Sequence, residues 1–199
     1  MSDGADLEIR QIVQRVIRQA VGLNGPAAAP SAPPALSPDP AKTEAQPAVK
    51  QTVAFGADHG GFELKEALKA DAAALGFEII DMGTTGKEAV DYPDFAHKVA
   101  ALVGAGKAWR GIVVDGAGIG SCIVANKIPG VRAGMAYDYS SAVNGREHND
   151  TNVLTLGAGL IGANLARLIL RTWLATPFAG GRHAPRVDKI TAVEKQYLK

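Results

Sequence analysis

Asp115 and the glycines that follow it are the residues of this sequence whose types and spacing could most readily do chemistry. An apolar run ends on Asp115, and glycine then stands at every second position from 116 to 120. This order predicts a buried strand, a tight turn and the start of a helix. Glycine lets a backbone approach a ligand closely, and unpaired N–H groups at a helix start can bind an anion or an oxyanion. Because open α/β sheets bind ligands at the carboxyl ends of their strands, this turn is a candidate site.

The glycine turn also admits plainer interpretations. Its GAGIG spacing is not GxGxxG, and no Lys-Ser or Lys-Thr pair follows, so a dinucleotide site or a P-loop is disfavoured. In the plainest interpretation the stretch is an ordinary strand-to-helix turn that Asp115 caps. In the alternative, Asp115 is a general base, because desolvation beside an apolar strand makes a carboxylate more basic.

Four further groups of polar residues could do chemistry, although each is weak evidence alone. They are Asp58-His59-Gly60-Gly61, Asp91-Tyr92-Pro93-Asp94, Arg146-Glu147-His148-Asn149-Asp150, and the tail stretch from Gly180 to Asp188. Taken singly, His59 could belong to a helix cap, His148 to an ordinary loop, and the arginines of the tail to a solvated basic face. The four histidines and the single cysteine lack metal-ligand spacing, so no metal site is predicted.

The composition argues against several classes of protein. The 199 residues carry 21 lysines and arginines against 20 aspartates and glutamates, so no strong field would attract nucleic acid or a membrane surface. Cys122 is the only cysteine, so no intrachain disulfide can form, and a cytoplasmic location is expected. No apolar run approaches the roughly 18 residues of a membrane span, and the N-terminus lacks the apolar core of a secretory signal.

Residues 1–50 differ in pattern from the rest of the chain. Apolar residues recur at helical spacing along residues 6–23, with polar residues on the opposite face, so residues 1–24 are predicted to hold an amphipathic helix. Residues 25–50 are rich in proline and alanine, with seven of the eleven prolines, and predict a disordered linker. Such a helix cannot bury its apolar face alone, so it is expected to dock on another protein; packing on its own domain is the alternative.

Residues 51–199 are expected to form one domain in which strands and helices alternate. The expected strands are 52–56, 77–81, 112–114, 131–137 and 152–156. The expected helices are 62–75, 94–103, 140–146 and 163–174, with a further helix after the glycine turn and another in the tail beyond 186. This alternation predicts an α/β fold, a doubly wound parallel five-stranded sheet covered on both faces.

Taken in order, the five polar groups resemble those of the ribose-5-phosphate isomerase B family, which includes the subunits of galactose-6-phosphate isomerase. The resemblance covers about residues 51–195. It implies a Rossmann-like fold that interconverts phosphorylated aldoses and ketoses without metal or cofactor. It also implies a homodimer, or a dimer of dimers, whose sites lie between two subunits. The implied substrate is a sugar phosphate of four to six carbons, with ribose 5-phosphate as the default.

The same resemblance implies a role for individual residues. Asp115 and His148 are expected to be catalytic, Asp115 as the base that removes the C2 proton and His148 as the residue that assists ring opening from the partner subunit. Arg182 and Arg186 are expected to hold the phosphate, a task suited to planar, permanently charged donors. The expected substrate-binding residues are Asp58, His59, Tyr92, Gly116, Ala117, Gly118, Ile119, Gly120 and Asn149. Among these, the glycine turn is expected to offer N–H groups to an enediolate.

Three positions depart from the family's pattern. Asp115 stands where many members carry a cysteine as the proton-transfer base, Ala117 where a hydroxyl residue is usual, and Gly159 where members carry an arginine. An aspartate at the first position also occurs in the A-type subunit of galactose-6-phosphate isomerase, which works beside a B-type subunit. A non-catalytic or partner-dependent A-type subunit is therefore the alternative function. A nucleotide-binding regulatory module is a third, disfavoured by the missing phosphate fingerprint.

The N-terminal helix and linker resemble, in architecture and not in motif, the encapsulation peptides that carry cargo enzymes into bacterial microcompartments. This resemblance implies that residues 6–23 bind a shell or scaffold protein, and that the protein is located inside a bacterial microcompartment. The expected partners are therefore a sugar phosphate, a second subunit and a shell or scaffold protein, with neither nucleic acid nor membrane among them.

Overall fold

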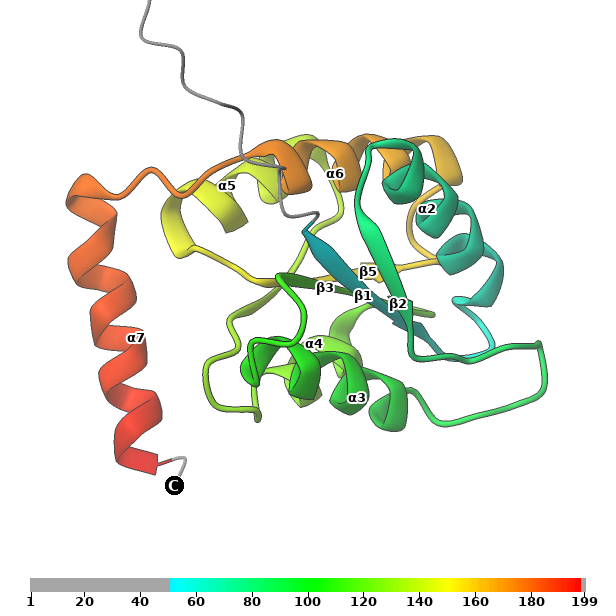
Figure 1. The fold of residues 1–199 in the computed structure, drawn as a ribbon, viewed down its shortest axis with the longest axis horizontal. Helices are drawn as coiled ribbons and strands as arrows, with labels where there is room; N and C mark the ends of the chain where they lie inside the picture. Colours follow the sequence, from blue (N-terminus) through cyan, green and yellow to red (C-terminus); the bar gives the residue numbers. More distant parts are fainter. Residues whose placement is uncertain (1–50, 198–199) are drawn as a thin grey trace, which may run out of the picture. The chain divides into compact units, whose positions relative to one another are not determined.

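The two central strands of the structure, β3 (Arg110–Asp115) and β5 (Val153–Gly157), are buried along their whole length. The computed structural model describes residues 51–197, and its five parallel strands lie in the order β2-β1-β3-β5-β4 (Figure 1). The outer strands are β1 (Thr52–Ala57), β2 (Glu78–Asp81) and β4 (Ala133–Met135). Asp115, the last residue of β3, is paired in register with Gly157, the last residue of β5.

Helices cover both faces of this sheet. They are α2 (Phe62–Ala74), α3 (Tyr92–Gly104), α4 (Ile119–Ala125), α5 (Tyr139–Asn149), α6 (Ala163–Ala175) and α7 (Ala184–Tyr197), with a 3-10 helix, η1 (Gly181–His183), before α7. Figure 1 shows α2, α5 and α6 on one face and α3 and α4 on the other. The predicted α/β fold, a doubly wound parallel sheet of five strands, is confirmed.

The two helical layers receive alternate side chains of the same strands. Val53 and Phe55 of β1 are fully buried in one core, together with Trp173 of α6. Ala54, between them in sequence, lies in the opposite core with Val99 of α3. This period of two is the geometry of a strand with both faces covered. Each fully buried apolar side chain of this size contributes roughly 1.5–3 kcal/mol, so the two cores hold the strand ends in place.

The end of α5 differs from its predicted position. The sequence predicts a helix that ends at residue 146, but α5 continues to Asn149. Asp150 then ends the helix, because it adopts a left-handed conformation with φ of 47°. As a result, His148 and Asn149 lie on the last turn of a helix and not in a loop, which restricts their side chains far more.

Smaller differences concern two other elements. α3 begins at Tyr92, two residues earlier than predicted, since Pro93 is well suited to the first turn of a helix. β4 is confined to Ala133–Met135, shorter than the predicted 131–137.

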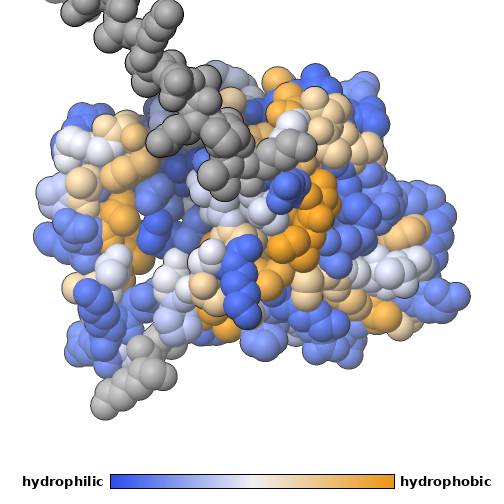
Figure 2. All heavy atoms as spheres, viewed as in Figure 1, coloured by the Kyte–Doolittle hydropathy of each residue, from blue (hydrophilic) through white to orange (hydrophobic). Residues whose placement is uncertain are grey.

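α7 has little contact with its own chain beyond η1. The carboxylate of Glu194 accepts a hydrogen bond of 2.8 Å from the N–H of Gly130, while Ile190, Val193 and Tyr197 are exposed. Figure 1 shows α7 standing apart from the sheet, and Figure 2 shows hydrophobic residues gathered over it, at the left of the view. An amphipathic helix is stabilised mainly by packing of its apolar face, and within residues 51–197 the apolar residues of the outer part of α7 are left exposed.

The predicted N-terminal helix (1–24) and the predicted linker (25–50) lie outside the described residues, as do residues 198 and 199. Within residues 51–197, no helix is long and apolar enough to cross a membrane.

Candidate active site

One part of the candidate site is built at the carboxyl ends of β1 and β3. Asp58 follows β1 directly and is buried, and its carboxylate accepts a 2.9 Å hydrogen bond from the N–H of Gly61. His59 is exposed, with its Nδ1 3.2 Å from the backbone N–H and carbonyl oxygen of Val90. The loop before α3 therefore holds His59 at the mouth of the site.

Tyr92 comes to the same place from the start of α3. A Cβ atom added to Gly120 would lie 2.5 Å from the Tyr92 ring, so the ring lies directly against the glycine turn. A Cβ atom added to Gly60 would lie 3.9 Å from the N atom of Gly116, so the turns after β1 and β3 are neighbours. The structure therefore brings together Asp58, His59, Tyr92 and the turn 115–120. These residues are called the carboxyl-edge half of the site.

Asp115 uses its carboxylate to organise the glycine turn. Oδ1 accepts hydrogen bonds from the N–H groups of Ala117, at 2.8 Å, and Gly118. Oδ2 accepts from the N–H of Ser121, at 3.1 Å, and from the hydroxyl of the same residue. A carboxylate offers about four lone-pair positions, and here all four face a donor. The capping of the turn by Asp115, which was the plainest interpretation of the sequence, is therefore present in the structure.

Some N–H groups of the turn bind Asp115, and others remain without an acceptor inside the turn. Those of Ala117 and Gly118, expected to face a substrate, point at Asp115 instead. The N–H groups of Ile119 and Gly120 lie in the first turn of α4, where they have no acceptor within the helix. Gly118 has φ of 78°, a left-handed conformation that favours glycine. The turn therefore keeps two N–H donors for a ligand.

The other part of the candidate site lies on α5, η1 and α7. The rings of His148 and His183 are stacked, with centroids 4.0 Å apart and planes at 9°. Arg182 lies next to His183 in η1, and Arg186 lies in the first turn of α7; both arginines are exposed. Together with Asn149, these residues form a basic group that is called the amino-edge half of the site.

Burial and neighbouring positive groups act on the buried histidine of this half. Desolvation lowers the pKa of His183, and so do His148, Arg182 and Arg186, whereas Glu147 acts in the opposite direction. The Nδ1 atom of His183 is buried and has no hydrogen-bond partner within the described residues. These surroundings therefore favour the neutral form of His183, which lies beside His148 and near two arginines suited to binding an anion.

Within one chain, the carboxyl-edge half lies at the carboxyl ends of the strands and the amino-edge half lies at their amino ends. Asp115 is level with Gly157 at the carboxyl end of β5, whereas Asn149 is only four residues from Val153 at its amino end. Five residues of strand span about 16 Å, so one small sugar phosphate cannot touch both halves. The structure therefore brings the predicted site residues together in two groups and does not join the groups.

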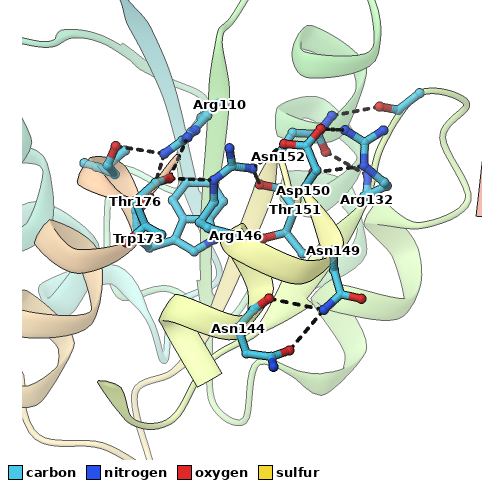
Figure 3. A network of polar contacts seen from close by, with 12 residues as sticks. Arg110, Arg132, Asn144, Arg146, Asn149, Asp150, Thr151, Asn152, Trp173 and Thr176 are labelled. Carbon is cyan, nitrogen blue, oxygen red and sulfur yellow. Dashed lines mark hydrogen bonds and ion pairs between the residues drawn. The ribbon is translucent and has the colours of Figure 1, made fainter. Parts of the chain in front are cut away.

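Asp150 fixes the end of α5 between two arginines. Its carboxylate lies 2.6 Å from Nη2 of Arg132 and 2.9 Å from Nη1 of Arg146 (Figure 3). Arg146 is buried, and it also donates to the carbonyl oxygens of Thr151 and, at 3.2 Å, Thr176. The sequence placed Arg146 and Asp150 beside His148 but assigned them no role, and the structure shows that they anchor the helix end.

Arg110 is a residue that sequence reasoning missed. Its guanidinium is buried and donates to the carbonyl oxygens of Trp173, at 2.7 Å, and Leu174, at 2.9 Å, at the end of α6 (Figure 3). With Arg146 it therefore anchors the segment that leads to Arg182. The sequence signal that could have identified Arg110 is a lone arginine at the start of an apolar strand. A charge buried there requires dedicated hydrogen-bond partners.

A cavity of about 610 Å³ runs along the edge strand β4. Arg132, Tyr137 and Asp138 line it from the strand and its flanks, Asn144 and Asn149 from α5, and Ile190 from α7. Of the predicted site residues, only Asn149 lines this cavity. Within residues 51–197, no three His, Cys, Asp or Glu side chains are grouped so that they could hold a metal ion.

Comparison with known proteins identifies the family of this chain. The family model described as Ribose/Galactose Isomerase matches residues 53–190. Ribose-5-phosphate isomerase B of Escherichia coli (strain K12) is 44% identical over 144 residues, which are 72% of this chain and 97% of that protein. The D-erythrulose-4-phosphate isomerase of Pectobacterium atrosepticum is 40% identical over 147 residues, which are 73% of this chain and 96% of that protein.

The same similarity appears in three dimensions. The structure of ribose-5-phosphate isomerase B from Clostridium thermocellum superposes with a TM-score of 0.73 at 48% identity, covering 74% of this chain and 99% of the other. The resemblance stated from the polar groups is thus confirmed for the domain, while residues 1–50 lie outside the matched family model. The chain therefore belongs to the ribose/galactose isomerase family and is an aldose–ketose isomerase of the ribose-5-phosphate isomerase B type.

Proposed function

We propose that this chain interconverts the aldose and ketose forms of a sugar phosphate of four to six carbons through an enediolate, with ribose 5-phosphate and ribulose 5-phosphate as the default pair. The observation that carries the proposal is the convergence of Asp58, His59, Tyr92 and the turn 115–120 at one edge of the sheet. These groups are distant in sequence, and they supply carboxylates, a hydroxyl and free N–H donors at one place. The relative that is a D-erythrulose-4-phosphate isomerase supports the lower end of the size range.

The complete site requires a second copy of the chain. The two halves lie at opposite ends of the strands in one chain. A sugar whose phosphate is held by Arg182 and Arg186 can therefore reach the turn 115–120 only if that turn belongs to another subunit. The exposed apolar residues of α7 and the open cavity along β4 provide surface for that interface. A homodimer with two shared sites satisfies both requirements, since a two-fold axis duplicates each contact.

In the proposed reaction, Asp115 removes the proton from C2 of the aldose. The C2–H electron pair forms the C1–C2 double bond, and the negative charge moves to the oxygen at C1, where the N–H groups of Ile119 and Gly120 stabilise it. The proton of the C2 hydroxyl then passes to the oxygen at C1, and Asp115 returns its proton to C1 as the C2–O bond becomes the carbonyl of the ketose. Since all four lone-pair positions of Asp115 face donors, the Ser121 hydroxyl must first rotate away; it is the only donor of the four that can rotate.

That same saturation favours a second candidate function. A carboxylate that caps a turn with all its lone pairs is in use as a structural group, so the chain could be the partner-dependent or non-catalytic A-type subunit of a heteromeric isomerase. In that case another chain supplies the base.

Assay of the purified chain separates the two functions. The pure protein is given ribose 5-phosphate, ribulose 5-phosphate, erythrulose 4-phosphate and a six-carbon aldose phosphate, and the products are resolved by NMR. Conversion of at least one substrate without any other protein supports the autonomous isomerase. Absence of conversion in every case, with the chain shown to be folded, contradicts it and leaves the partner-dependent subunit.

A separate proposal concerns residues 1–50, and it rests on the sequence pattern alone. We propose that residues 6–23 bind a shell or scaffold protein of a bacterial microcompartment. Deletion of residues 1–50 is expected to leave the assembly and the catalytic constants unchanged and to abolish association with the shell. Fusion of residues 1–24 to a fluorescent protein should transfer that association. Loss of the dimer or of activity in the truncated chain would contradict the proposal.

A further inference from the structure

We infer that Lys65 is a positioning residue: it fastens the loop 82–91 to α2, and that loop holds His59 in the carboxyl-edge half of the site. The inference rests on the proposed function, because its kinetic test measures the same reaction. The side chain of Lys65 is fully buried, so it acts through His59 and not by contact with a substrate.

A fully buried lysine is rare, and its charge requires partners. The ammonium group of Lys65 has three N–H donors, and three acceptors surround it. Nζ lies 2.8 Å from the carboxylate of Asp81, 3.0 Å from that of Glu66 and 2.7 Å from the main-chain carbonyl oxygen of Thr84. Asp81 is the last residue of β2, so Lys65 binds the chain where the loop leaves the sheet.

The first residues of the loop are also bound to the end of β1. The N–H of Ala57 donates to the carbonyl oxygen of Gly83, and the N–H of Thr84 donates to that of Ala57, both at 2.7 Å. The carboxylate of Asp81 accepts a further hydrogen bond of 2.9 Å from the N–H of Gly83. Because site residues follow β1 directly, these bonds hold the start of the loop and the site together.

The last part of the loop holds His59, one of the expected substrate-binding residues. Nδ1 of His59 lies 3.2 Å from both the backbone nitrogen and the carbonyl oxygen of Val90. A protonated Nδ1 can donate to the carbonyl oxygen, and an unprotonated Nδ1 can accept from the N–H, so Val90 holds the ring in either state. Because the ring is exposed, its position depends on the position of the loop.

An exposed ion pair also joins the middle of the loop to α2. Lys87 pairs with Glu63, but their side chains are 67% and 76% exposed, and ion pairs between exposed groups contribute little. Figure 1 shows the loop reaching outward between β2 and α3, at the right of the view. The buried contacts of Lys65 are therefore the stronger attachment of the loop to α2.

A change at Lys65 should reach His59 through the loop. Without the ammonium group, the carbonyl oxygen of Thr84 loses that donor, and the loop is free to move. A misplacement of about 1 Å in a site can cost about 100-fold in rate, so a small movement of His59 is enough to matter. Tyr92 should stay in place, because it begins α3, a helix held by its own buried residues.

The first test is a double-mutant cycle. Lys65→Met keeps an apolar side chain of similar length and removes the donors. It should lower kcat about tenfold and leave KM within about twofold, because orientation of the reacting carbons is lost. In a His59→Ala background the same substitution should lower kcat less than about twofold, since the residue through which it acts is gone. In a Tyr92→Phe background the loss of about tenfold should remain.

Lys69→Met is the matched control. Lys69 binds the same two carboxylates, those of Glu66 and Asp81, but within the described residues it makes no hydrogen bond to the loop, so kcat should be retained. Asp81→Asn is a milder second variant, because it keeps the shape of the side chain and removes the charge that binds Lys65. It should lower kcat by a smaller factor, with the same dependence on His59, and it carries the cycle if Lys65→Met does not fold.

A spectroscopic measurement completes the test without requiring activity. In ligand-free protein, the ring proton signals of His59 are assigned by their loss in His59→Ala. They should shift in Lys65→Met and stay in place in Lys69→Met. Unchanged kcat in Lys65→Met, equal losses with and without His59, or an unshifted His59 signal would overturn the inference. If the wild-type chain converts no sugar phosphate, the proposed function fails, and the His59 signals still decide whether Lys65 positions this ring.

Discussion

The carboxyl-edge half and the amino-edge half of the site are built by different physical means. The first is made of turns, in which Asp115 binds the backbone of its own loop and Gly118 lies where a side chain would not fit. The second is made of side chains on helix ends, anchored by buried arginines that bind Asp150 and the carbonyl groups after α6. The first half is thus specified locally, whereas the second depends on contacts between distant segments.

This difference indicates how the two halves can change independently. Substitutions in the carboxyl-edge half should act on the chemical step. Substitutions in the amino-edge half should act on phosphate binding, substrate choice and stability. The predictions below test that division, beginning with the largest expected effect.

Asp115→Asn should lower turnover by at least about 100-fold, because an amide cannot accept the C2 proton, and loss of a general base costs roughly 10²–10⁴-fold. Turnover is measured with the substrate that the pure chain converts best. Ser121→Ala is the matched control, because it removes one donor to Asp115 and leaves the carboxylate in place, so it should retain most activity. Turnover above about a tenth of wild type in Asp115→Asn would leave Asp115 as a turn cap only.

Arg182→Ala and Arg186→Ala should each raise KM about tenfold with little change in kcat. Both arginines are expected to hold the phosphate equally in the ground state and the transition state, and loss of such uniform binding raises KM alone. Steady-state kinetics provide the measurement. Arg171→Ala is the control, since Arg171 is an exposed arginine on α6 that pairs with Asp71. An unchanged KM in both variants would place Arg182 and Arg186 on a solvated face.

Arg146→Met should lower the free energy of unfolding by about 3 kcal/mol, because it removes the donor to two carbonyl oxygens and leaves the Asp150 carboxylate with Arg132 alone. Arg132→Met should cost less, because the Arg132 side chain is 23% exposed against 7% for Arg146. Urea unfolding measures both. Equal losses in the two variants would show that the buried anchor of the amino-edge half is not the stronger one.

The smallest expected effect is a pH dependence of stability carried by His183. Burial, with nearby His148, Arg182 and Arg186, lowers the pKa of His183, so the folded state binds this proton less readily than the unfolded state does. The free energy of unfolding should therefore fall as pH drops through about 6.5 and should level off below the folded pKa. His183→Phe keeps a buried ring and should flatten the profile between pH 7 and 5. An unchanged slope would assign the dependence to other groups.

The sequence predicts the carboxyl-edge half better than the amino-edge half, and the reason is the range of the interactions. An apolar run, an aspartate and alternate glycines specify a strand and a turn locally, so the place of Asp115 at the end of β3 is confirmed. The alternation of strands and helices likewise predicts the doubly wound sheet. The four donors that surround Asp115 were harder to foresee, since a carboxylate in a turn can face inward or outward.

The amino-edge half depends on contacts that no local pattern contains. The extension of α5 to Asn149 follows from the left-handed Asp150 and from the two arginines that bind it, one of them 18 residues earlier in the chain. The stacking of His148 on His183 joins segments 35 residues apart. Composition and periodicity therefore identified these residues as polar groups but could not predict which of them meet.

The central claim is that each active site combines the carboxyl-edge half of one subunit with the amino-edge half of another. Complementation tests it directly: Asp115→Asn and Arg182→Ala/Arg186→Ala chains, each inactive or nearly so at low substrate, are mixed, dissociated and reassociated. Random pairing makes half of the dimers mixed, and each mixed dimer contains one site with both halves intact, so about a quarter of the wild-type activity should return. If mixing restores no activity although mixed dimers form, the two halves of a site belong to the same chain, and the shared site is contradicted.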